Sequence, residues 1–577
     1  MSNIVILGAG TAGTMLANKL RRALPQGQWN IAIVDQDNQH HYQPGYLFIP
    51  FGTYKPRSVV KSRKSFIPRG VRFFQDTITK VDREEKLVHL QSGKGLRYDY
   101  LIVTTGTRTR PDMVPGMADG SLWYDKVFDF YTLEGSSRLA EALKNMRSGK
   151  LVVHISEMPI KCPVAPIEFA LLADDYFFKR RLRDDIEITF VTPLDGPFTK
   201  PVASKHLGQL MKIRDIEVEG DFMVSHIDNE NQMLVSYDDR EIPFDVLVTV
   251  PPNTGQQFIM DSGMGDDVGF VPVDHHTLQS LADPNIFCIG DAAAVPTSKA
   301  GSVAHFQGDS FVPNFLNHIQ GIPMSETFDG HSNCFIETGK GKGMLLDFNY
   351  EQEPVPGVFP LPVVGPLKLL RMSRLNHLAK LAFYYVYWWL LIRGLPLPFP
   401  KDMSLVGKEI EVEDQLRTAN PVVVPVQTRV TGAPEIQLQT TPRVSTAPKV
   451  RPGVRRRAPI QEPTGEVTPT GSATGTATIG GREVAVNAEG FMTDPGQWDE
   501  DLAKALAALI GIELSEEHWA ALRFMRQDHA QVGVTPTLRR MQTVGGFHPQ
   551  LLFKLFPKKP AKKMAYIAGL PKPVGCV

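Results

Sequence analysis

The chain has 577 residues, of which 42% are hydrophobic, and this length predicts two to four domains rather than one. Lys and Arg together number 62, as do Asp and Glu, so the overall charge gives no reason to expect nucleic acid as a partner. Four cysteines are too few for a secreted disulfide scaffold and are typical of a reducing compartment. An apolar strand begins directly after Ser2, which leaves no room for a signal peptide, so we expect a cytoplasmic protein.

The chain divides into four segments that differ in composition. Residues 1–350 alternate β-branched runs with helical patterns, which indicates α/β units around parallel sheets. Residues 351–404 are apolar and interrupted by prolines. Residues 405–481 are rich in Pro, Thr, Val and Gly without a helical period, so we expect a flexible linker. Residues 482–577 regain helical periodicity, with Ser515 as an expected N-cap, and predict a small, mainly helical domain.

A glycine-rich turn follows the first predicted strand. Gly8, Gly10 and Gly13 open a predicted helix, and glycines at this spacing let a pyrophosphate approach the backbone N–H groups at the helix N-terminus. The next strand, at 31–34, ends in Asp35, whose carboxylate can hold a pair of ribose hydroxyls. Strand, turn, helix, strand and acid in this order predict a dinucleotide site. The alternative is a glycine-rich turn in an unrelated α/β unit.

Two later strand ends favour FAD as the dinucleotide. One apolar strand leads into Thr105-Gly106, and another leads into Gly290-Asp291. These segments resemble the strand-plus-ATG element and the closing GD motif of flavoproteins with two dinucleotide-binding domains. The resemblance implies an α/β fold with two Rossmann-like domains of the disulfide reductase type. It also implies FAD as the cofactor and contact between Asp291 and the FAD ribitol.

A loop with a cysteine takes the place of a second glycine fingerprint. Flavoprotein reductases repeat the fingerprint near residue 150 to bind NAD(P)H, but here the strand at 151–155 leads into prolines and Cys162. Prolines and side chains keep a pyrophosphate away from the backbone, so nicotinamide binding is disfavoured. Glu168, six residues after Cys162, either manages a proton beside the thiolate or has a structural role.

A second cysteine, Cys334, precedes a predicted strand at 344–349. The segments around Cys162 and Cys334 are similar to the redox-cysteine segments of the sulfide:quinone oxidoreductase and flavocytochrome c sulfide dehydrogenase family, and the likeness covers about residues 1–400. It implies that sulfide attacks a disulfide or polysulfide bridge between the two cysteines. It also implies that electrons then pass through FAD to a quinone.

Four further positions bear on this resemblance. Lys299 and His305 follow the GD motif, and each either contacts flavin or quinone or has an ordinary polar role. Many members of the family carry a third cysteine near residues 126–131, where this chain has none, which leaves the length of the sulfur product open. Cys288 lies in an apolar strand and is expected to be a buried structural thiol. No metal site is expected.

The segment at 351–404 contains an uncharged, aromatic run at 381–392. Its 12 residues are fewer than the roughly 20 that a helix needs to cross a bilayer. Lys380 and Arg393 flank the run, and basic flanks with aromatic residues are typical of an interfacial helix. We expect amphipathic, monotopic attachment on the cytoplasmic side of the inner membrane, since quinone is dissolved in lipid. The alternative is a helix buried in the core or in a dimer interface.

The chain ends in a Pro/Gly-rich tail whose penultimate residue is Cys576, and such a tail is exposed. The tail, together with Phe491, Trp498 and Trp519, resembles the DsrC/TusE sulfur-relay family. The resemblance implies that Cys576 carries persulfide sulfur. Ala565 stands where DsrC has a second arm cysteine, so an intramolecular bridge cannot form. The alternatives for this domain are a helical DNA-binding module and a degenerate regulatory domain.

The two resemblances together predict a sulfide oxidase with a tethered sulfur carrier. Sulfide would be oxidised to sulfane sulfur or polysulfide, electrons would reach a membrane quinone, and sulfur would pass to Cys576 or to separate sulfur-relay proteins. One alternative is a type II NADH:quinone oxidoreductase, which would need glycines near residue 156 and no cysteine pair. A non-enzymatic sulfur-carrier scaffold is the other.

Overall fold

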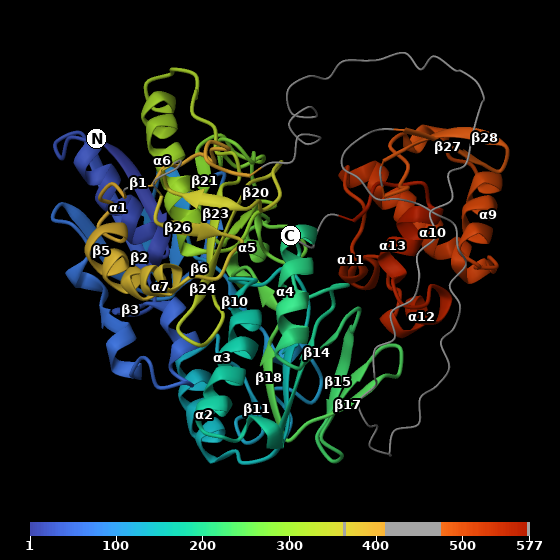
Figure 1. The fold of residues 1–577 in the computed structure, drawn as a ribbon. Coiled ribbons are helices and arrows are strands. Elements are labelled where there is room, and N and C mark those ends of the chain that lie inside the picture. Colours follow the sequence, from blue (N-terminus) through green and yellow to red (C-terminus); the bar gives the residue numbers. More distant parts are fainter. Residues whose placement is uncertain (362–364, 398, 410–474, 488, 574–577) are drawn as a thin grey trace, which may run out of the picture.

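The computed structural model describes residues 1–361, 365–397, 399–409, 475–487 and 489–573 (Figure 1). Most of the expected linker and the expected sulfur carrier Cys576 lie outside these residues. Among the described residues, no helix combines the length and the apolar character that crossing a bilayer requires.

The first α/β domain is built on a parallel sheet of five strands in the order β21-β9-β1-β2-β5. Its strands are β1 (Ser2–Leu7), β2 (Trp29–Asp35), β5 (Val71–Gln75), β9 (Tyr100–Val103) and β21 (Ile286–Cys288). Side chains of β1 alternate between the two faces, as the period of a strand requires. Ile4 and Ile6 pack with α1 (Thr11–Ala23) and α6 (Gly301–His318). Val5 and Leu7 enter the core on the opposite face.

The second α/β domain repeats this plan with a parallel sheet in the order β11-β18-β12-β13-β14. Its strands are β11 (Val127–Phe128), β12 (Gly149–Ile155), β13 (Ile186–Val191), β14 (Ile216–Glu219) and β18 (Val246–Val250). Its helices are α2 (Leu133–Asn145), α3 (Ala165–Lys179) and α4 (Pro201–Ile213). The two sheets confirm the predicted α/β fold with two dinucleotide-type domains.

Short strands and one short helix complete the two domains. They form the three-stranded sheets β6-β7-β8 and β15-β16-β17 and the pairs β3-β4, β10-β19 and β20-β22. Their bounds are β3 (Gln39–His41), β4 (Val60–Ser62), β6 (Ile78–Asp82), β7 (Leu87–Leu90), β8 (Gly95–Arg97), β10 (Arg108–Thr109), β15 (Val224–Asp228), β16 (Met233–Ser236), β17 (Glu241–Pro243), β19 (Asn253–Thr254), β20 (Val271–Pro272), β22 (Ala293–Ala294) and α5 (Gln257–Asp261).

A third sheet, in the order β23-β24-β26-β25, follows the first two domains. Its elements are β23 (Ser332–Glu337), β24 (Gly343–Phe348), β25 (Gly357–Phe359) and β26 (Leu367–Leu369), and α7 (Arg374–Val386) packs on β23 and β24. A five-residue π-helix, Tyr387–Leu391, continues α7. Tyr387 and Trp388 are 1% exposed and belong to the core of the first domain. Part of the run at 381–392 is therefore core, whereas Tyr385 and Trp389 are 65% and 63% exposed.

The C-terminal domain has its own apolar core and stands as a separate lobe in Figure 1. It consists of the hairpin β27 (Gly475–Ile479) and β28 (Arg482–Val486) and the helices α9 (Glu500–Leu509), α10 (Glu516–Val532), α11 (Leu538–Thr543), α12 (Pro549–Leu555) and α13 (Pro560–Ile567). Ser515 caps α10 as predicted, in a reciprocal capping box with His518. Because β27 pairs with β28, the ordered domain begins by Gly475, earlier than the predicted start at 482.

Candidate active site

The glycine turn after β1 has the conformation that a dinucleotide site needs. Gly8 has φ +90°, and a Cβ on Gly13 would collide with the carbonyl oxygen of Gly8, so both positions require glycine. A Cβ on Gly10 would meet open space, which leaves the backbone there accessible. Asp35 Oδ2 accepts a hydrogen bond from the N–H of Ala9 at 2.7 Å. The predicted acid thus lies directly beside the predicted turn.

Buried polar atoms near this turn lack protein partners and fit a bound FAD. The hydroxyl oxygens of Thr105 and Thr107 are buried, and neither forms a hydrogen bond within the described part of the chain. Gly106 has φ +62° and open space where a Cβ would stand. Burying a hydroxyl without a partner is costly, so a ligand that supplies hydrogen bonds would stabilise this region. The open backbone at Gly10 and Gly106 is where the groups of FAD would approach.

The side chain of Lys299 holds the closing GD motif by binding backbone carbonyl oxygens of that segment. Its ammonium group is buried, donates hydrogen bonds to the carbonyl oxygens of Asp291 (2.8 Å) and Ala293 (3.0 Å), and lies 4.0 Å from the centre of the Phe270 ring. Burial lowers the pKa of Lys299 and raises that of the Asp291 carboxyl, and the opposite charges counteract both shifts. Gly290 N donates to Gln307 at 2.7 Å. Lys299 therefore orders the GD loop, whatever else it contacts.

Cys162 lies on a loop that pairs with the segment around Lys299. The N–H of Cys162 donates to the carbonyl oxygen of Lys299 at 2.8 Å, and the Tyr131 hydroxyl donates to Lys161 O at 2.7 Å. Cys162 has φ +47°, a left-handed conformation that non-glycine residues adopt rarely. Its carbonyl oxygen accepts from the N–H of Ala165, the first residue of α3. The loop is thus fixed on both sides of the thiol.

Cys334 lies on β23, 5% exposed, and contacts the segment that also binds the Cys162 loop. Its sulfur is 3.6 Å from the Ser332 hydroxyl and 4.0 Å from the Ser298 hydroxyl. The chain therefore brings two cysteines that are 172 residues apart into contact with the same short segment, residues 298–299. The two thiols are free, with no disulfide between them.

Burial makes both thiols weak acids. It raises the pKa of Cys162 to about 12, with a further increase from the charges of Glu168 and Cys334. Burial also raises the pKa of Cys334, and hydrogen bonds with Ser332 and Ser298 oppose the shift. An effect of Cys334 on the pKa of Cys162 is what a neighbouring thiolate produces. A nearby positive charge is needed to hold either one as a thiolate.

Lys380 supplies that charge. Its ammonium group lowers the pKa of both cysteines, donates to the carbonyl oxygen of Phe335 at 2.8 Å and forms an ion pair with Glu168. Glu168 has no exposed surface, and its carboxylate also accepts from the N–H of Glu337 at 2.7 Å. Burial raises the pKa of Glu168 to about 7, against the opposing effect of Lys380. A buried ion pair thus lies beside the cysteine pair.

Sequence reasoning identified Glu168 but missed the role of Lys380. Lys380 entered the prediction only as a basic residue next to an apolar run, and its partner is 212 positions away. The only available signal was that a lysine at the edge of an uncharged helix needs a partner if the helix is buried.

His305 lies on α6, 1% exposed, with its pKa lowered by burial. Cys288 is fully buried, as predicted for a structural thiol.

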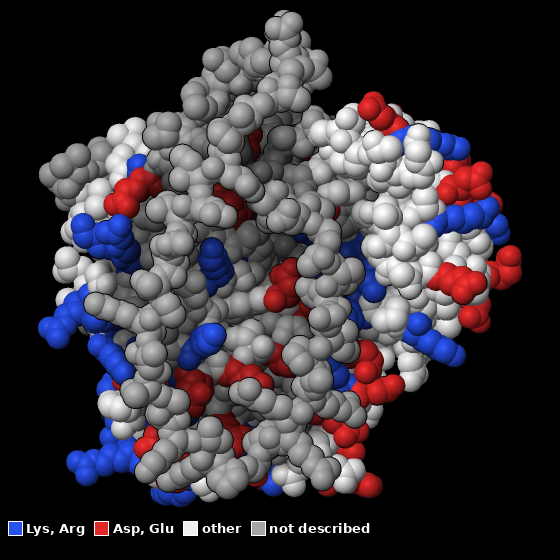
Figure 2. Space-filling model, turned by 45° about the vertical axis from the view of Figure 1, so that its right-hand side comes forward, with Lys and Arg blue, Asp and Glu red and all other residues white. Residues whose placement is uncertain are grey.

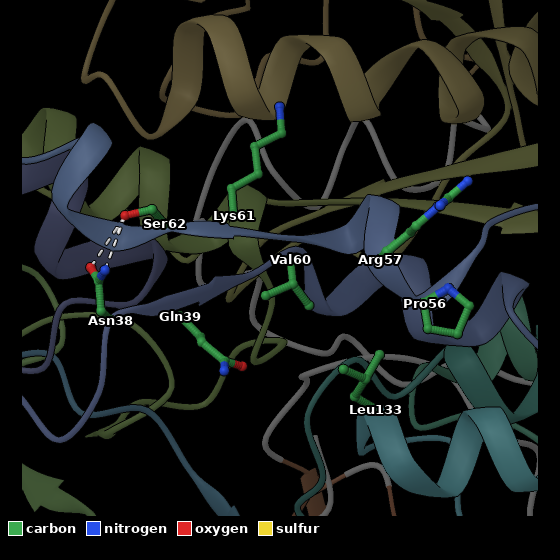
Figure 3. Close-up of a pocket in the computed structure, with 8 residues that line it drawn as sticks. All are labelled: Asn38, Gln39, Pro56, Arg57, Val60, Lys61, Ser62 and Leu133. Carbon is green, nitrogen blue, oxygen red and sulfur yellow. Dashed lines mark hydrogen bonds between the residues drawn. The ribbon is translucent and has the colours of Figure 1, made fainter.

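Two cavities of the described chain are lined by neither cysteine of the pair. One, shown in Figure 3, is lined by residues of β3, β4 and the segments next to them, with one residue from α2, and none of the predicted catalytic residues lines it. These residues are Asn38, Gln39, Pro56, Arg57, Val60, Lys61, Ser62 and Leu133. Lys61 extends toward the helix above it, and its ammonium lies 4.4 Å from the centre of the Trp388 ring. A second hollow is lined by Thr53, Tyr54, Ser58, Leu381, Tyr384 and Tyr385.

Known proteins match the two ends of the chain separately. Residues 2–154 match the family described as pyridine nucleotide-disulphide oxidoreductase, and residues 478–577 match the family described as DsrC like protein. Sulfurtransferase TusE of Salmonella typhimurium is 41% identical over 104 residues, which are 17% of this chain and 95% of that protein. The C-terminal domain belongs to the DsrC family.

The N-terminal part of the chain is homologous to sulfide:quinone oxidoreductases. The mitochondrial enzyme of Dictyostelium discoideum is 29% identical over 355 residues, which are 61% of this chain and 78% of the relative. The crystal structure of the sulfide:quinone oxidoreductase from Aquifex aeolicus has the same fold, with a TM-score of 0.57 at 19% identity over 68% of this chain and 92% of that one. The chain is therefore a fusion of an oxidoreductase homologue with a DsrC-family domain, as the two resemblances predicted.

Proposed function

We propose that the chain oxidises sulfide with FAD and the Cys162/Cys334 pair, delivers the electrons to a membrane quinone, and transfers sulfur to Cys576. The observation that carries the proposal is the convergence of two cysteines on residues 298–299, with the Glu168–Lys380 ion pair beside them. The loop that carries Cys162 replaces the glycine turn that a second dinucleotide would need.

The first step is attack of HS⁻ on a disulfide between Cys162 and Cys334. It breaks the S–S bond, places a persulfide on one cysteine and leaves a thiolate on the other. The ammonium group of Lys380 stabilises the thiolate, because it lowers the pKa of both sulfurs. Glu168 can take up the proton released when sulfide enters, since its pKa of about 7 lets it exchange protons near neutral pH.

Transfer of the outer sulfur to the Cys576 thiol completes the sulfur pathway. The S–S bond of the persulfide breaks, a new S–S bond forms on Cys576, and Cys162 and Cys334 are left as a reduced pair. When this pair forms its disulfide again, two electrons are released, and a bound FAD would supply the acceptor chemistry that links them to a quinone. Residues Gly8, Gly10, Gly13, Asp35, Thr105, Gly106, Gly290 and Asp291 would hold the FAD.

The proposal includes attachment to the cytoplasmic surface of the inner membrane, because a quinone is dissolved in lipid and must be reached there. Large apolar side chains stand exposed on residues 361–389, among basic residues. They are Leu361, Met372, Leu375, Leu378, Tyr385 and Trp389. Exposed apolar side chains grouped with lysines and arginines favour binding to the interface of an anionic bilayer.

The experiment that tests the proposed enzyme is anaerobic addition of sulfide to the purified FAD-loaded chain. We expect sulfide to bleach the flavin absorbance and NADH to leave it unchanged. The Cys162→Ser and Cys334→Ser variants should bind FAD and resist bleaching by sulfide, whereas Cys288→Ser, which changes a buried thiol outside the pair, should behave as wild type. Bleaching by NADH alone would support the NADH:quinone alternative, and no bleaching by either would support a carrier scaffold.

A further inference from the structure

Acidic residues mark the carboxyl edge of the second parallel sheet. Glu157 follows β12, Asp195 follows β13 and Asp221 follows β14. Ligands of open α/β sheets bind outside the carboxyl ends of the strands, so this edge is where a second dinucleotide would lie. Carboxylates repel a pyrophosphate, and they make the edge suitable for a basic partner instead.

The DsrC-family domain provides that partner in the same chain. Arg539 of α11 pairs with Glu157 at 2.6 Å, and its guanidinium also lies 3.2 Å from the Met113 sulfur. Lys559, next to α13, is 3.2 Å from the Asp221 carboxylate. Lys562 of α13 is likewise 3.5 Å from Asp195. Three acidic strand ends thus meet three basic side chains, and Figure 2 shows Lys and Arg beside Asp and Glu where the two lobes meet.

A second arginine of α11 is fixed in place before it reaches across the interface. Arg540 donates to both carboxylate oxygens of Asp528 at 2.6 Å within its own domain, and Asp528 is buried. The same guanidinium pairs with Asp267 of the flavoprotein part. A guanidinium held by a bidentate partner loses little conformational entropy when it binds another carboxylate. Asp267 is therefore met by a preorganised cation.

An aromatic contact accompanies the ion pairs. The rings of Tyr237 and Phe553 stack with their centres 5.9 Å apart and their planes at 20°. Tyr237 follows β16, and Phe553 lies on α12. Aromatic residues surrounded by polar contacts are the usual arrangement of a specific protein interface. The stacked rings have a defined geometry, so they fix the orientation of the two domains more closely than the ion pairs alone would.

The start of the C-terminal tail is bound on the same side of the domain. The Thr535 hydroxyl donates to the carbonyl oxygen of Pro571 at 2.7 Å, and Thr535 precedes α11 by three residues. Cys576 follows the last described residue, Pro573, by three positions. Three residues reach at most about 11 Å when extended.

We propose that the DsrC-family domain docks on the carboxyl edge of the second sheet and receives sulfur there, in the place where related folds bind a second dinucleotide. Arg539 contacts the residue five positions before Cys162, on the loop that carries this thiol. The docked domain therefore contacts the loop of Cys162 directly, so its tail does not have to search through the length of the linker. Sulfur transfer in this form rests on the proposed function, whereas docking itself does not.

Docking is tested by carbodiimide cross-linking of the full chain followed by peptide mass spectrometry. The reagent joins carboxylates to amines in direct contact, so it should join Lys559 to Asp221 and Lys562 to Asp195. The Arg539→Glu variant should lose these cross-links, and the charge swap Glu157→Arg with Arg539→Glu should restore them. Arg523→Glu is the matched control, because Arg523 pairs with Glu500 inside its own domain and should leave the cross-links unchanged. Absence of both cross-links in the wild-type chain would overturn the proposal.

Transfer is tested by following the mass of the C-terminal peptide after a single addition of sulfide. Arg539→Glu should add sulfur to Cys576 about tenfold more slowly, since interfacial charge pairs govern encounter and residence. Flavin reduction should slow with it, because the cysteine pair re-forms its disulfide only after the sulfur has been transferred. The charge swap should recover the rate. An unchanged transfer rate in Arg539→Glu would overturn docked transfer. If sulfide reduces no flavin in the wild-type chain, the proposed function fails, and the cross-links still decide whether the domain docks.

Discussion

Lys380 links the carboxylate and the two thiols of the site, although it stands on a helix far from either cysteine in the sequence. It pairs with Glu168 and lowers the pKa of Cys162 and Cys334. Removing the ammonium while the carboxyl group stays buried leaves an unpaired ionisable group, which a protein tolerates poorly. Lys380 therefore acts on the two sulfurs through the electrostatic effect of its charge.

The Lys380→Met variant should make both cysteines less reactive. Loss of the positive charge raises their pKa values further, and alkylation slows about tenfold for each unit of pKa because only the thiolate reacts. Rates for each cysteine can be read by mass spectrometry after timed exposure to iodoacetamide. Lys368→Met, at an exposed position, should leave the rates unchanged. Adding Glu168→Gln should partly restore them, because the Glu168 charge raises the pKa of Cys162; no effect of Lys380→Met would contradict its role.

Glu168 should give the fold a pH dependence. Burial raises its pKa from 4.5 to about 7, so the folded state favours the protonated carboxyl, and the resulting stability is complete below pH 4.5 and is lost as the pH rises through about 7. The free energy of unfolding of the wild-type chain, relative to Glu168→Gln, should therefore fall by up to ~3 kcal/mol over this range. Urea unfolding at several pH values measures it, and parallel curves for the two proteins would show that the carboxyl group is not perturbed.

The sequence predicted both cysteines and the FAD turn because each lies in a short contiguous pattern. Gly8 and Gly13 are fixed by local backbone geometry, and Cys162 replaces a glycine turn at a recognisable place. Lys380 could not be predicted, because its function arises from tertiary contact with Glu168. Arg63 could not be predicted as a site residue for the same reason. It follows β4 and pairs with Asp35 at the end of β2.

At the scale of elements, the aromatic run at 381–392 has two different faces. Composition predicted one amphipathic segment, but the structure places Tyr387 and Trp388 in the core and leaves Tyr385 and Trp389 exposed. A run without charges contains no information about which face is buried, and the π-helix of five residues changes the usual 3.6-residue period. Likewise, the hairpin that begins at Gly475 follows a Gly/Thr-rich stretch whose composition resembles a linker.

Two adjacent tryptophans provide a matched test of these faces. Trp388 is 1% exposed and stacks on Phe66 at 5.3 Å, whereas Trp389 is 63% exposed. We expect Trp388→Ala to lower the free energy of unfolding by about 3–5 kcal/mol and Trp389→Ala to change it by less than about 0.5 kcal/mol. Chemical denaturation measures both. Equal effects would contradict the division of the run into a core face and an exposed face.

At the scale of the molecule, a net charge of zero does not show that two surfaces of the chain carry opposite charges. Equal numbers of acidic and basic residues gave no reason to expect nucleic acid as a partner, and they do not reveal that an acidic sheet edge meets a basic face of the C-terminal domain within the chain. Composition averages over both sides of such an interface and cancels them. The sequence predicted the fusion and its fold, and the contact between the parts needed three-dimensional arrangement.

The exposed apolar face should govern membrane binding. Replacing Tyr385 and Trp389 together by Ser should weaken sedimentation with anionic phospholipid vesicles by at least about tenfold, because aromatic side chains at the interface supply much of the apolar area. Sulfide should still bleach the flavin of this variant. Leu509→Ser is the control, since Leu509 is equally exposed but lies on the C-terminal domain. Unchanged vesicle binding would place the membrane contact elsewhere or exclude it.

The hydrogen bonds of the Tyr387 hydroxyl limit how far the chain can be truncated from its C-terminal side. It lies 2.8 Å from the Thr11 hydroxyl and 2.8 Å from a ring nitrogen of His40, while Arg22 donates to the carbonyl oxygen of Arg393 at 2.9 Å. Residues that close the first domain therefore come from the far end of the flavoprotein part. A truncation that stops at residue 350 would remove them and open the core beside the glycine turn. The smallest autonomous flavoprotein should therefore end beyond Gly394.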